Sequence, residues 1–258
     1  MWLKHRLKRL KAKWRHLNRY FVTLSSANDI ERQTDFKNHE HLVLILYGFG
    51  ATRRSVSILE TRLKNDDYGV LSFRLGGLMD LFNTAPIDRL AKEVLKKVER
   101  LQQKHQFKKL SIIGYSKGGL IGRYCLSHLN GEQYIHTLIT LASPHRGNPW
   151  ALLSSIFLVG LFSKGVRQMT PGSKFLRRLN ASPLPENVYV SSISSAKDKS
   201  CPPSFCRLSN NHAHPRIINV TLPHLYHSDF IIKQSAYHVI RKHLEAGLDY
   251  ARTCERCQ

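Results

Sequence analysis

A serine flanked by glycines is the feature of this chain that most directly suggests a reaction. Residues 114–118 read Gly-Tyr-Ser-Lys-Gly, a G-x-S-x-G pattern centred on Ser116. The apolar run 110–113 precedes the pattern, and the helix-like stretch 120–126 follows it. A sharp turn from strand to helix exposes a serine hydroxyl at a helix N-terminus, where it acts as a nucleophile. The pattern therefore predicts a catalytic serine, with an inert glycine-rich turn as the alternative.

A nucleophilic serine requires a histidine that takes its proton and an acid that orients this histidine. In open α/β sheets such groups lie in the loops that follow the carboxyl ends of strands. Between residues 187 and 228 the only acid is Asp198, which comes just after the apolar run 188–193. We therefore predict that Asp198 is the catalytic acid. The alternative is an aspartate that only begins the turn before Pro202.

Two histidines, His224 and His227, follow the last predicted strand and precede the last predicted helix. His227 lies nearer to the helix, so we predict that it is the base, with His224 as the alternative. The three catalytic residues then occur along the chain in the order Ser116, Asp198, His227.

Attack on a carbonyl group also requires two backbone N–H groups that bind the developing oxyanion. Lys117 directly follows the serine and would supply one of them. Phe49 would supply the other, from the glycine-rich loop 47–50 that follows the apolar run 42–46. The glycines of this loop allow close approach of the backbone. A phosphate-binding loop is the alternative, although neither of its usual glycine patterns is present.

The cysteines are a second set of reactive side chains. Cys125 lies on the apolar side of the helix after the serine, which predicts a core position. Cys201 with Cys206, and Cys254 with Cys257, form two close pairs that would become disulfides in an oxidising compartment. A zinc site built from these four residues is the alternative. The predicted reaction itself requires neither a metal nor an organic cofactor.

Strands that alternate with helices must position these side chains. Apolar runs predict strands over residues 42–46, 69–75, 110–113, 136–142, 188–193 and 217–222, and helices over residues 58–63, 86–105 and 230–247. This alternation favours a mostly parallel sheet with helices on both faces. The predicted fold class is therefore α/β, and 258 residues are enough for one substantial core.

The charge of the chain is unusually positive. Forty Lys and Arg against eighteen Asp and Glu give a formal net charge of +22. Such a charge favours polyanions, and an anionic lipid surface or a nucleic acid is the expected kind of partner. The alternative is a generally basic surface of solvated lysines.

Residues 1–28 contain no acid and carry an apolar residue at every third or fourth position. This spacing predicts an amphipathic helix with tryptophan and leucine on one face and cations on the other, which is typical of a membrane interface. We expect residues 1–24 to bind an anionic membrane surface. A transit peptide, a helix packed on its own domain and a nucleic-acid-binding arm are the alternatives, of which nucleic acid is less favoured. The segment lacks the pattern of a secretory signal, which favours the cytoplasmic face, whereas the paired cysteines favour an oxidising compartment.

Five ordered blocks of the sequence resemble the bacterial triacylglycerol lipase and esterase group of the α/β-hydrolase superfamily. These blocks are the loop 46–50, the serine and its helix 112–124, the segment 141–147, the acid block 198–203 and the histidine block 227–231. The resemblance covers about residues 42–244 and implies an α/β-hydrolase fold with Ser116, Asp198 and His227 as its triad. It also implies that His145 is a structural residue.

The resemblance divides the chain into parts. It implies an α/β-hydrolase domain over residues 29–250, with a lid-like insertion at 149–185 that begins with the apolar stretch 150–162. Such a lid covers an acyl-binding cleft and opens against lipid. A buried core helix is the alternative for the apolar stretch. Residues 251–258 would then form a short cysteine-containing tail.

Two residues depart from the pattern of this group. Tyr47 replaces the usual histidine before the oxyanion glycine, and Lys117 replaces the methionine or glutamine that usually follows the serine. The backbone donor at residue 117 is unaffected by this change. We expect the Lys117 ammonium to lie beside the oxyanion hole and to favour an anionic acyl or phosphate-bearing substrate.

These features together predict a serine carboxylester hydrolase, a lipase or esterase that cleaves lipid-like esters through an acyl-enzyme at a membrane surface. An acyltransferase or thioesterase on the same fold is one alternative, because these enzymes share the acyl-enzyme. A non-catalytic module that binds membranes or nucleic acid is the other, and the net charge is the reason to consider it.

Overall fold

The computed structural model of the protein describes residues 36, 39, 41–76, 83–149, 151, 163–209 and 217–256. The basic segment 1–28, most of the apolar stretch 150–162 and Cys257 lie outside these described residues. The amphipathic N-terminal helix, the apolar part of the lid and a pairing of Cys254 with Cys257 therefore stay predictions. Within the described ranges, every helix is too short or too polar to cross a membrane.

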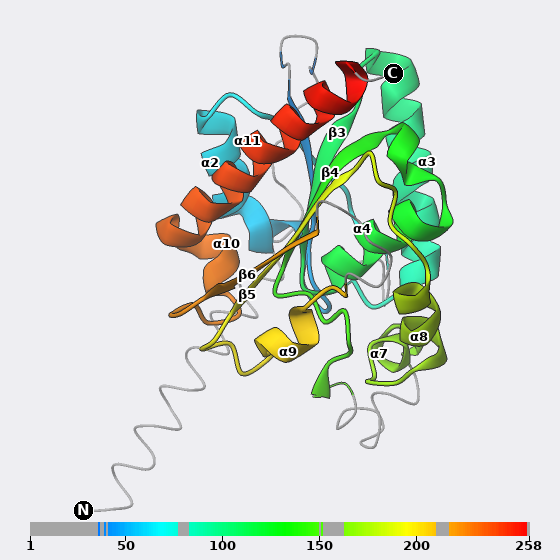
Figure 1. Cartoon of the computed structure of the whole chain (residues 1–258), viewed down its shortest axis with the longest axis vertical. Helices are drawn as coiled ribbons and strands as arrows, with labels where there is room; N and C mark the ends of the chain where they lie inside the picture. The colour runs from blue at the N-terminus through cyan, green and yellow to red at the C-terminus, as the bar shows by residue number, and fades with distance from the viewer. Residues whose placement is uncertain are drawn as a thin grey trace, which may run out of the picture.

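A parallel sheet forms the centre of the described part of the chain (Figure 1). Its six strands are β1 (Leu42–Leu46), β2 (Gly69–Ser72), β3 (Leu110–Tyr115), β4 (Ile135–Leu141), β5 (Tyr189–Ser195) and β6 (Ile217–Leu222). They lie in the order β2-β1-β3-β4-β5-β6, and every neighbouring pair is parallel. The chain runs outward from β1 to β2 and then returns to β3 on the other side of β1. Ligands bind at such a reversal, outside the carboxyl ends of the strands.

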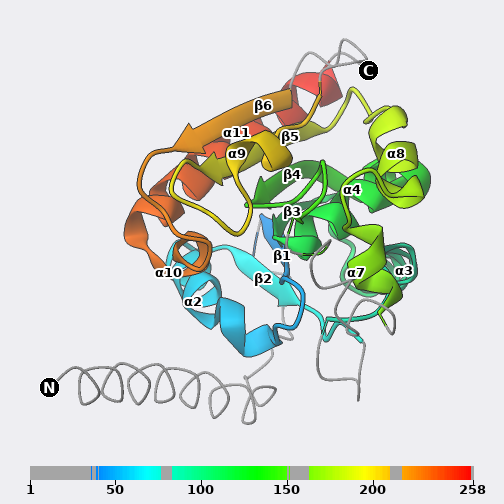
Figure 2. The ribbon, with the colours of Figure 1, turned by 90° about the horizontal axis from the view of Figure 1, so that it is seen from below.

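Helices cover both faces of this sheet (Figure 2). They are η1 (Arg53–Val56), α2 (Ser57–Asn65), α3 (Ile87–His105), α4 (Lys117–His128), η3 (Gly131–Gln133), α7 (Lys164–Gln168), α8 (Lys174–Ala181), α9 (Pro203–Cys206), α10 (Asp229–Ile232) and α11 (Gln234–Arg256). On one face α4 packs against β1, β3, β4 and the neighbouring helix α3. On the other face α11 packs against β4 and β5, with α2 and α10 beside it. The predicted α/β class with a mostly parallel sheet is confirmed.

The central strands are buried from both sides, which explains why they read as unbroken apolar runs in the sequence. All five residues of β1 are buried, and so are all six residues of β3. The edge strand β6 has partly buried and exposed residues along its whole length. The helix α3 shows the spacing of an amphipathic helix, because its apolar residues recur on one face, and this face packs into the core.

Three predicted boundaries are corrected. The second strand ends at Ser72 and not at residue 75, because the amide of Leu75 donates to the hydroxyl of Tyr47 (2.7 Å) and leaves the strand register. The final helix is interrupted at Lys233, whose extended backbone separates α10 from α11. Residues 251–256, expected as part of a separate tail, continue α11 to Arg256.

Candidate active site

Ser116 lies at the sharp turn between β3 and α4, at the carboxyl edge of the sheet. Its backbone has φ 52° and ψ −120°, a conformation that is unfavourable for a residue with a side chain. Two hydrogen bonds hold it there. The amide of Ser116 donates to the carbonyl of Leu141 (2.8 Å), and the amide of Gly119 donates to the carbonyl of Ser116 (3.1 Å). The serine is therefore presented by a constrained turn and not by a flexible loop.

Two glycines allow this turn to form. A Cβ atom on Gly118 would lie only 2.0 Å from the carbonyl oxygen of Leu46 in β1. A Cβ atom on Gly114 would lie 2.5 Å from the Cα atom of Gly119. The backbone of α4 thus contacts the backbone of the sheet directly, and this contact places the start of the helix beside the loop after β1.

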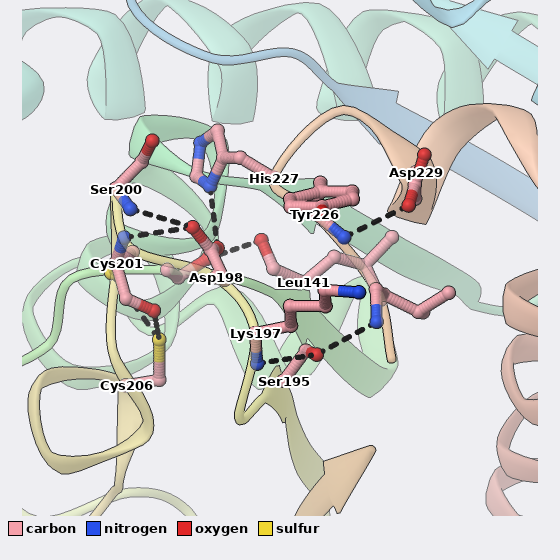
Figure 3. Close-up of polar contacts among 12 residues, drawn as sticks. Leu141, Ser195, Lys197, Asp198, Ser200, Cys201, Cys206, Tyr226, His227 and Asp229 are labelled. Atoms are coloured by element: carbon pink, nitrogen blue, oxygen red, sulfur yellow. Dashed lines mark hydrogen bonds and ion pairs between the residues drawn. The ribbon is translucent and has the colours of Figure 1, made fainter. Parts of the chain in front are cut away.

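Asp198 follows β5 and is almost completely buried, with 2% of its surface exposed. Its Oδ1 atom accepts hydrogen bonds from the amides of Ser200 (2.8 Å) and Cys201 (3.0 Å). Its Oδ2 atom accepts a hydrogen bond from Nδ1 of His227 (2.7 Å), as Figure 3 shows. Because an ionised carboxylate only accepts hydrogen bonds, Nδ1 of the histidine carries the proton. Its other ring nitrogen, Nε2, is then the one that can take a proton from a serine.

The ring of His227 lies over the residue that precedes the nucleophile. The ring centroids of His227 and Tyr115 are 5.1 Å apart. The structure thus brings the loops after β5 and β6 to the end of β3. His224, the alternative base, is exposed.

Two residues that the sequence analysis did not identify support the acid and the histidine. The hydroxyl of Ser195, at the end of β5, accepts hydrogen bonds from the amides of Leu225 (2.9 Å) and Lys197 (3.3 Å). It therefore joins the loop that carries the acid to the loop that carries the histidine (Figure 3). Asp229 accepts a hydrogen bond from the amide of Tyr226 (2.8 Å) and fixes the turn around the histidine. The position of Ser195 at a strand end is the only sequence signal that pointed to it.

The loop after β1 packs directly against the nucleophile. A Cβ atom on Gly48 would lie 3.1 Å from the Cβ atom of Ser116, a tight contact that glycine at this position avoids. The Tyr47 hydroxyl is buried, and burial raises its pKa, so it acts as a neutral hydrogen-bonding group. Lys117 is the first residue of α4, and the first amides of a helix have no acceptor within the helix. Lys117 thus adjoins the serine in the chain and the loop that carries Phe49 contacts the serine, whereas the role of both amides as oxyanion donors stays a prediction.

The surroundings of the Lys117 side chain do not support the expectation that its ammonium favours an anionic substrate. The side chain is fully buried, and its Nζ atom donates to the carbonyls of Asn83 (3.0 Å) and Ala85 (2.5 Å). Burial lowers the pKa of this amine to about 7. Because the amine points into the protein and already binds two carbonyls, it is not placed to form an ion pair with an anionic substrate.

His145 and Cys125 are packed inside the domain. The Nε2 atom of His145 lies 3.0 Å from the hydroxyl of Thr140, and burial holds the pKa of this histidine well below its usual value. Burial raises the pKa of Cys125 to about 12, as expected for a thiol in the core. Both side chains are fully buried.

The described part of the insertion contains α7 and α8. A separate cavity of about 290 Å³ lies between β2 and α3, and neither Ser116 nor His227 lines it. That cavity is distinct from the site at the carboxyl edge of β3. Among the described residues, no cluster of three or more histidine, cysteine or acidic side chains is arranged to hold a metal ion.

Comparisons with known proteins agree with this fold. Residues 37–163 match a family model described as "Putative serine esterase (DUF676)". A search of curated protein sequences gave no match. Among solved structures, the chain is similar to the mature form of Bacillus licheniformis lipase BlEst2, with a TM-score of 0.66 and 16% identity over 83% of this chain and 96% of that chain.

Two further solved structures show the same likeness. Aspergillus fumigatus lipase B gives a TM-score of 0.68 and 15% identity over 86% of this chain and 57% of that chain. Paleococcus ferrophilus monoacylglycerol lipase gives a TM-score of 0.57 and 15% identity over 81% of this chain and 94% of that chain. At these identities the likeness shows a shared fold, which is the α/β-hydrolase fold. The family match covers the loop after β1 and the turn that carries Ser116, so residues 37–163 of this chain are similar to that serine esterase family.

Proposed function

We propose that Ser116, His227 and Asp198 form the catalytic triad of a serine hydrolase that cleaves carboxylic esters. The observation that carries this proposal is the 2.7 Å hydrogen bond between His227 and the buried carboxylate of Asp198. This pair lies at the same sheet edge as the strained turn of Ser116, and the His227 ring lies over Tyr115. The Asp198 carboxylate also accepts hydrogen bonds from two backbone amides, which fix it in the position from which it orients the imidazole.

The proposed reaction uses these groups in two steps. Ser116 Oγ attacks the ester carbonyl while Nε2 of His227 takes the hydroxyl proton, and Asp198 stabilises the imidazolium that forms. The amides of Phe49 and Lys117 bind the oxyanion. The alcohol leaves with the proton from His227. Water, activated by the same histidine, then hydrolyses the acyl-enzyme.

Lipid-like esters at an anionic membrane surface are the proposed substrates. The high net positive charge and the apolar stretch 150–162 beside a basic segment support this assignment. The inner leaflet of a cell membrane carries a negative surface potential that attracts basic segments. We therefore place the protein peripherally, on the cytoplasmic face, with residues 1–24 as the membrane contact.

Replacing the nucleophile tests this function. Ser116→Ala keeps the Cβ atom and the same backbone, so the variant is expected to fold normally. Hydrolysis of p-nitrophenyl butyrate should fall by about 10⁴-fold or more, and labelling by a fluorophosphonate probe should be lost. Ser127→Ala is the matched control, because Ser127 lies on α4 and its hydroxyl binds groups of α4 itself, the carbonyl of Arg123 (3.0 Å) and Nδ1 of His128 (2.8 Å). Turnover by Ser116→Ala at the rate of the control would show that another group is the nucleophile.

A further inference from the structure

The side chain of Lys117 is the buried charged group closest in sequence to the nucleophile, and the proposed mechanism uses only its backbone amide. None of its surface is exposed. Burying an ammonium is unfavourable unless it is paired or hydrogen-bonded. In the part of the chain that the structure describes, carbonyl groups and not carboxylates are its partners, at 3.0 Å from Asn83 and 2.5 Å from Ala85. Such a costly arrangement next to the serine requires an explanation.

The carbonyls that Lys117 binds belong to a segment that also holds the oxyanion loop. The side-chain amide of Asn83 donates to the carbonyl of Tyr47 (2.6 Å). The backbone amide of Asn83 donates to the carbonyl of Ala51 (3.4 Å). Asn83 therefore ties both ends of the loop 47–51. The ring of Phe49, inside this loop, has its centroid 5.6 Å from Nζ of Lys117.

The same segment also contacts the insertion. The hydroxyl of Ser163 donates to the carbonyl of Thr84 (3.3 Å). A Cβ atom on Gly165, in α7, would lie 2.7 Å from the carbonyl oxygen of Thr84 and 3.2 Å from Nζ of Lys117. The amine thus occupies a space enclosed by α4, residues 83–85, the loop after β1 and α7.

We propose that the Lys117 side chain is a positioning residue that fixes the oxyanion loop relative to Ser116. This inference rests on the proposed function. Lys117 supplies one oxyanion donor through its own amide. Through Asn83 its side chain also sets the position of the loop that carries the second donor, Phe49. One residue therefore controls the distance between the two groups that must converge on the oxyanion.

The expected kinetic effect follows from this geometry. Oxyanion donors act on charge that develops in the transition state, and removing one donor costs about 10²–10³-fold in kcat. Displacing a donor without removing it should cost less, about 10- to 100-fold in kcat. KM should change little, because the oxyanion does not exist in the bound ester. A residue needed only for folding would not separate kcat from KM in this way.

The ionisation of Lys117 provides a second readout. The groups that face Nζ are the carbonyls of residues 83 and 85, the Phe49 ring and Gly165, and none of them titrates. Burial places the pKa of the amine near 7. Above that pH the neutral amine binds the carbonyls more weakly, because charge-assisted hydrogen bonds are the stronger ones. The wild-type kcat should therefore fall as the pH rises through this pKa.

Lys117→Met tests the proposal, with Arg123→Met as the matched control. Methionine keeps the length of the side chain and leaves the backbone amide in place. Arg123 lies on the same helix, is also buried and also binds a carbonyl, that of Leu179 (3.0 Å), but it joins α4 to α8. Both variants should lose thermal stability. Only Lys117→Met should lose kcat on p-nitrophenyl butyrate and the alkaline fall of its pH profile.

Gly165→Ala keeps the ammonium and disturbs the carbonyls around it, so it tests the same point if Lys117→Met does not fold. It should lower kcat with little change in KM. Wild-type kcat and pH profile in Lys117→Met, or in Gly165→Ala, would overturn the inference. So would equal losses of kcat in Lys117→Met and Arg123→Met. These results are distinct from a failure of the proposed function, which Ser116→Ala reports independently through the fluorophosphonate label.

Discussion

The backbone conformation of Ser116 costs about 1–3 kcal/mol for a residue with a side chain. This conformation persists because the surrounding hydrogen bonds and packing contacts hold the backbone in place. The amide of the serine is held by Leu141 in β4, and Gly118 of α4 lies against Leu46 of β1. The serine is consequently held at the carboxyl edge of the sheet, beside the loop that follows β1.

Asp198→Asn should remove most of the activity without unfolding the protein. The Oδ1 atom of Asp198 accepts from two amides, so the oxygen of an asparagine would take that place and its NH2 group would face His227. The NH2 group then donates to Nδ1, which moves the ring proton to Nε2 and leaves no base for Ser116. A loss of about 10⁴-fold in kcat is expected, measured on p-nitrophenyl butyrate.

Asp229→Asn is the control for this change. Asp229 lies two residues from His227, and its carboxylate binds the amide of Tyr226 (2.8 Å) and Nζ of Lys233 (2.9 Å). It should keep activity within about 10-fold, because it supports the turn and does not touch the imidazole. Similar losses in both variants would argue against a specific role for Asp198.

For individual residues, the sequence was enough to choose the proposed triad, because few candidate side chains follow the predicted strands. Asp198 was the only acid in its region, and the structure places it against His227. The direction of the Lys117 side chain was not predictable. It depends on carbonyls more than thirty residues earlier in the chain, and local pattern does not reveal which distant backbone encloses a side chain.

Among the elements, the buried strands were predicted best, because burial on both faces requires an unbroken apolar run. Strand and helix ends were predicted less well. The end of β2 depends on a hydrogen bond to Tyr47, which lies in the loop after β1. The break at Lys233 separates α10, which packs against α2, from α11, and neither this packing nor the Tyr47 bond leaves a local sequence signal.

The short helix α9 brings two cysteines into contact beside the acid loop. The sulfur atoms of Cys201 and Cys206 are 3.2 Å apart, and both residues are buried. The neighbouring thiol and burial hold the pKa of Cys201 well above its usual value, so the folded dithiol should react slowly. Folding in a glutathione redox buffer should instead close a disulfide. Closing so short a loop should raise the free energy of unfolding by about 2 kcal/mol.

Mass spectrometry of peptides measures this directly, since the linked peptide loses two hydrogen atoms. Cys125 is the internal control, because it is buried in the core away from this pair and should remain a thiol. Cys206→Ser should abolish both the mass change and the added stability. Full alkylation of Cys201 and Cys206 after folding in the redox buffer would contradict the prediction.

For the whole molecule, the net charge of +22 is the property that most directly predicts a binding partner. We expect the full-length protein to sediment with vesicles that contain anionic lipid and to remain free of neutral vesicles. Binding should weaken strongly between 0.1 and about 1 M salt, as the Debye length falls from about 10 Å to about 3 Å. Equal binding to neutral vesicles would contradict an electrostatic contact. Preferential binding to duplex DNA in the same salt series would favour nucleic acid as the partner.

The contact of Gly118 with the carbonyl of Leu46 limits how this enzyme can diversify. The turn that carries the nucleophile tolerates little change, because any side chain at residue 118 would push α4 away from β1. New substrate preferences must therefore arise in the surrounding segments, chiefly the insertion that contains α7 and α8. Directed evolution that randomises residues 163–185 should yield altered selectivity, whereas randomising residues 114–119 should yield mostly inactive proteins.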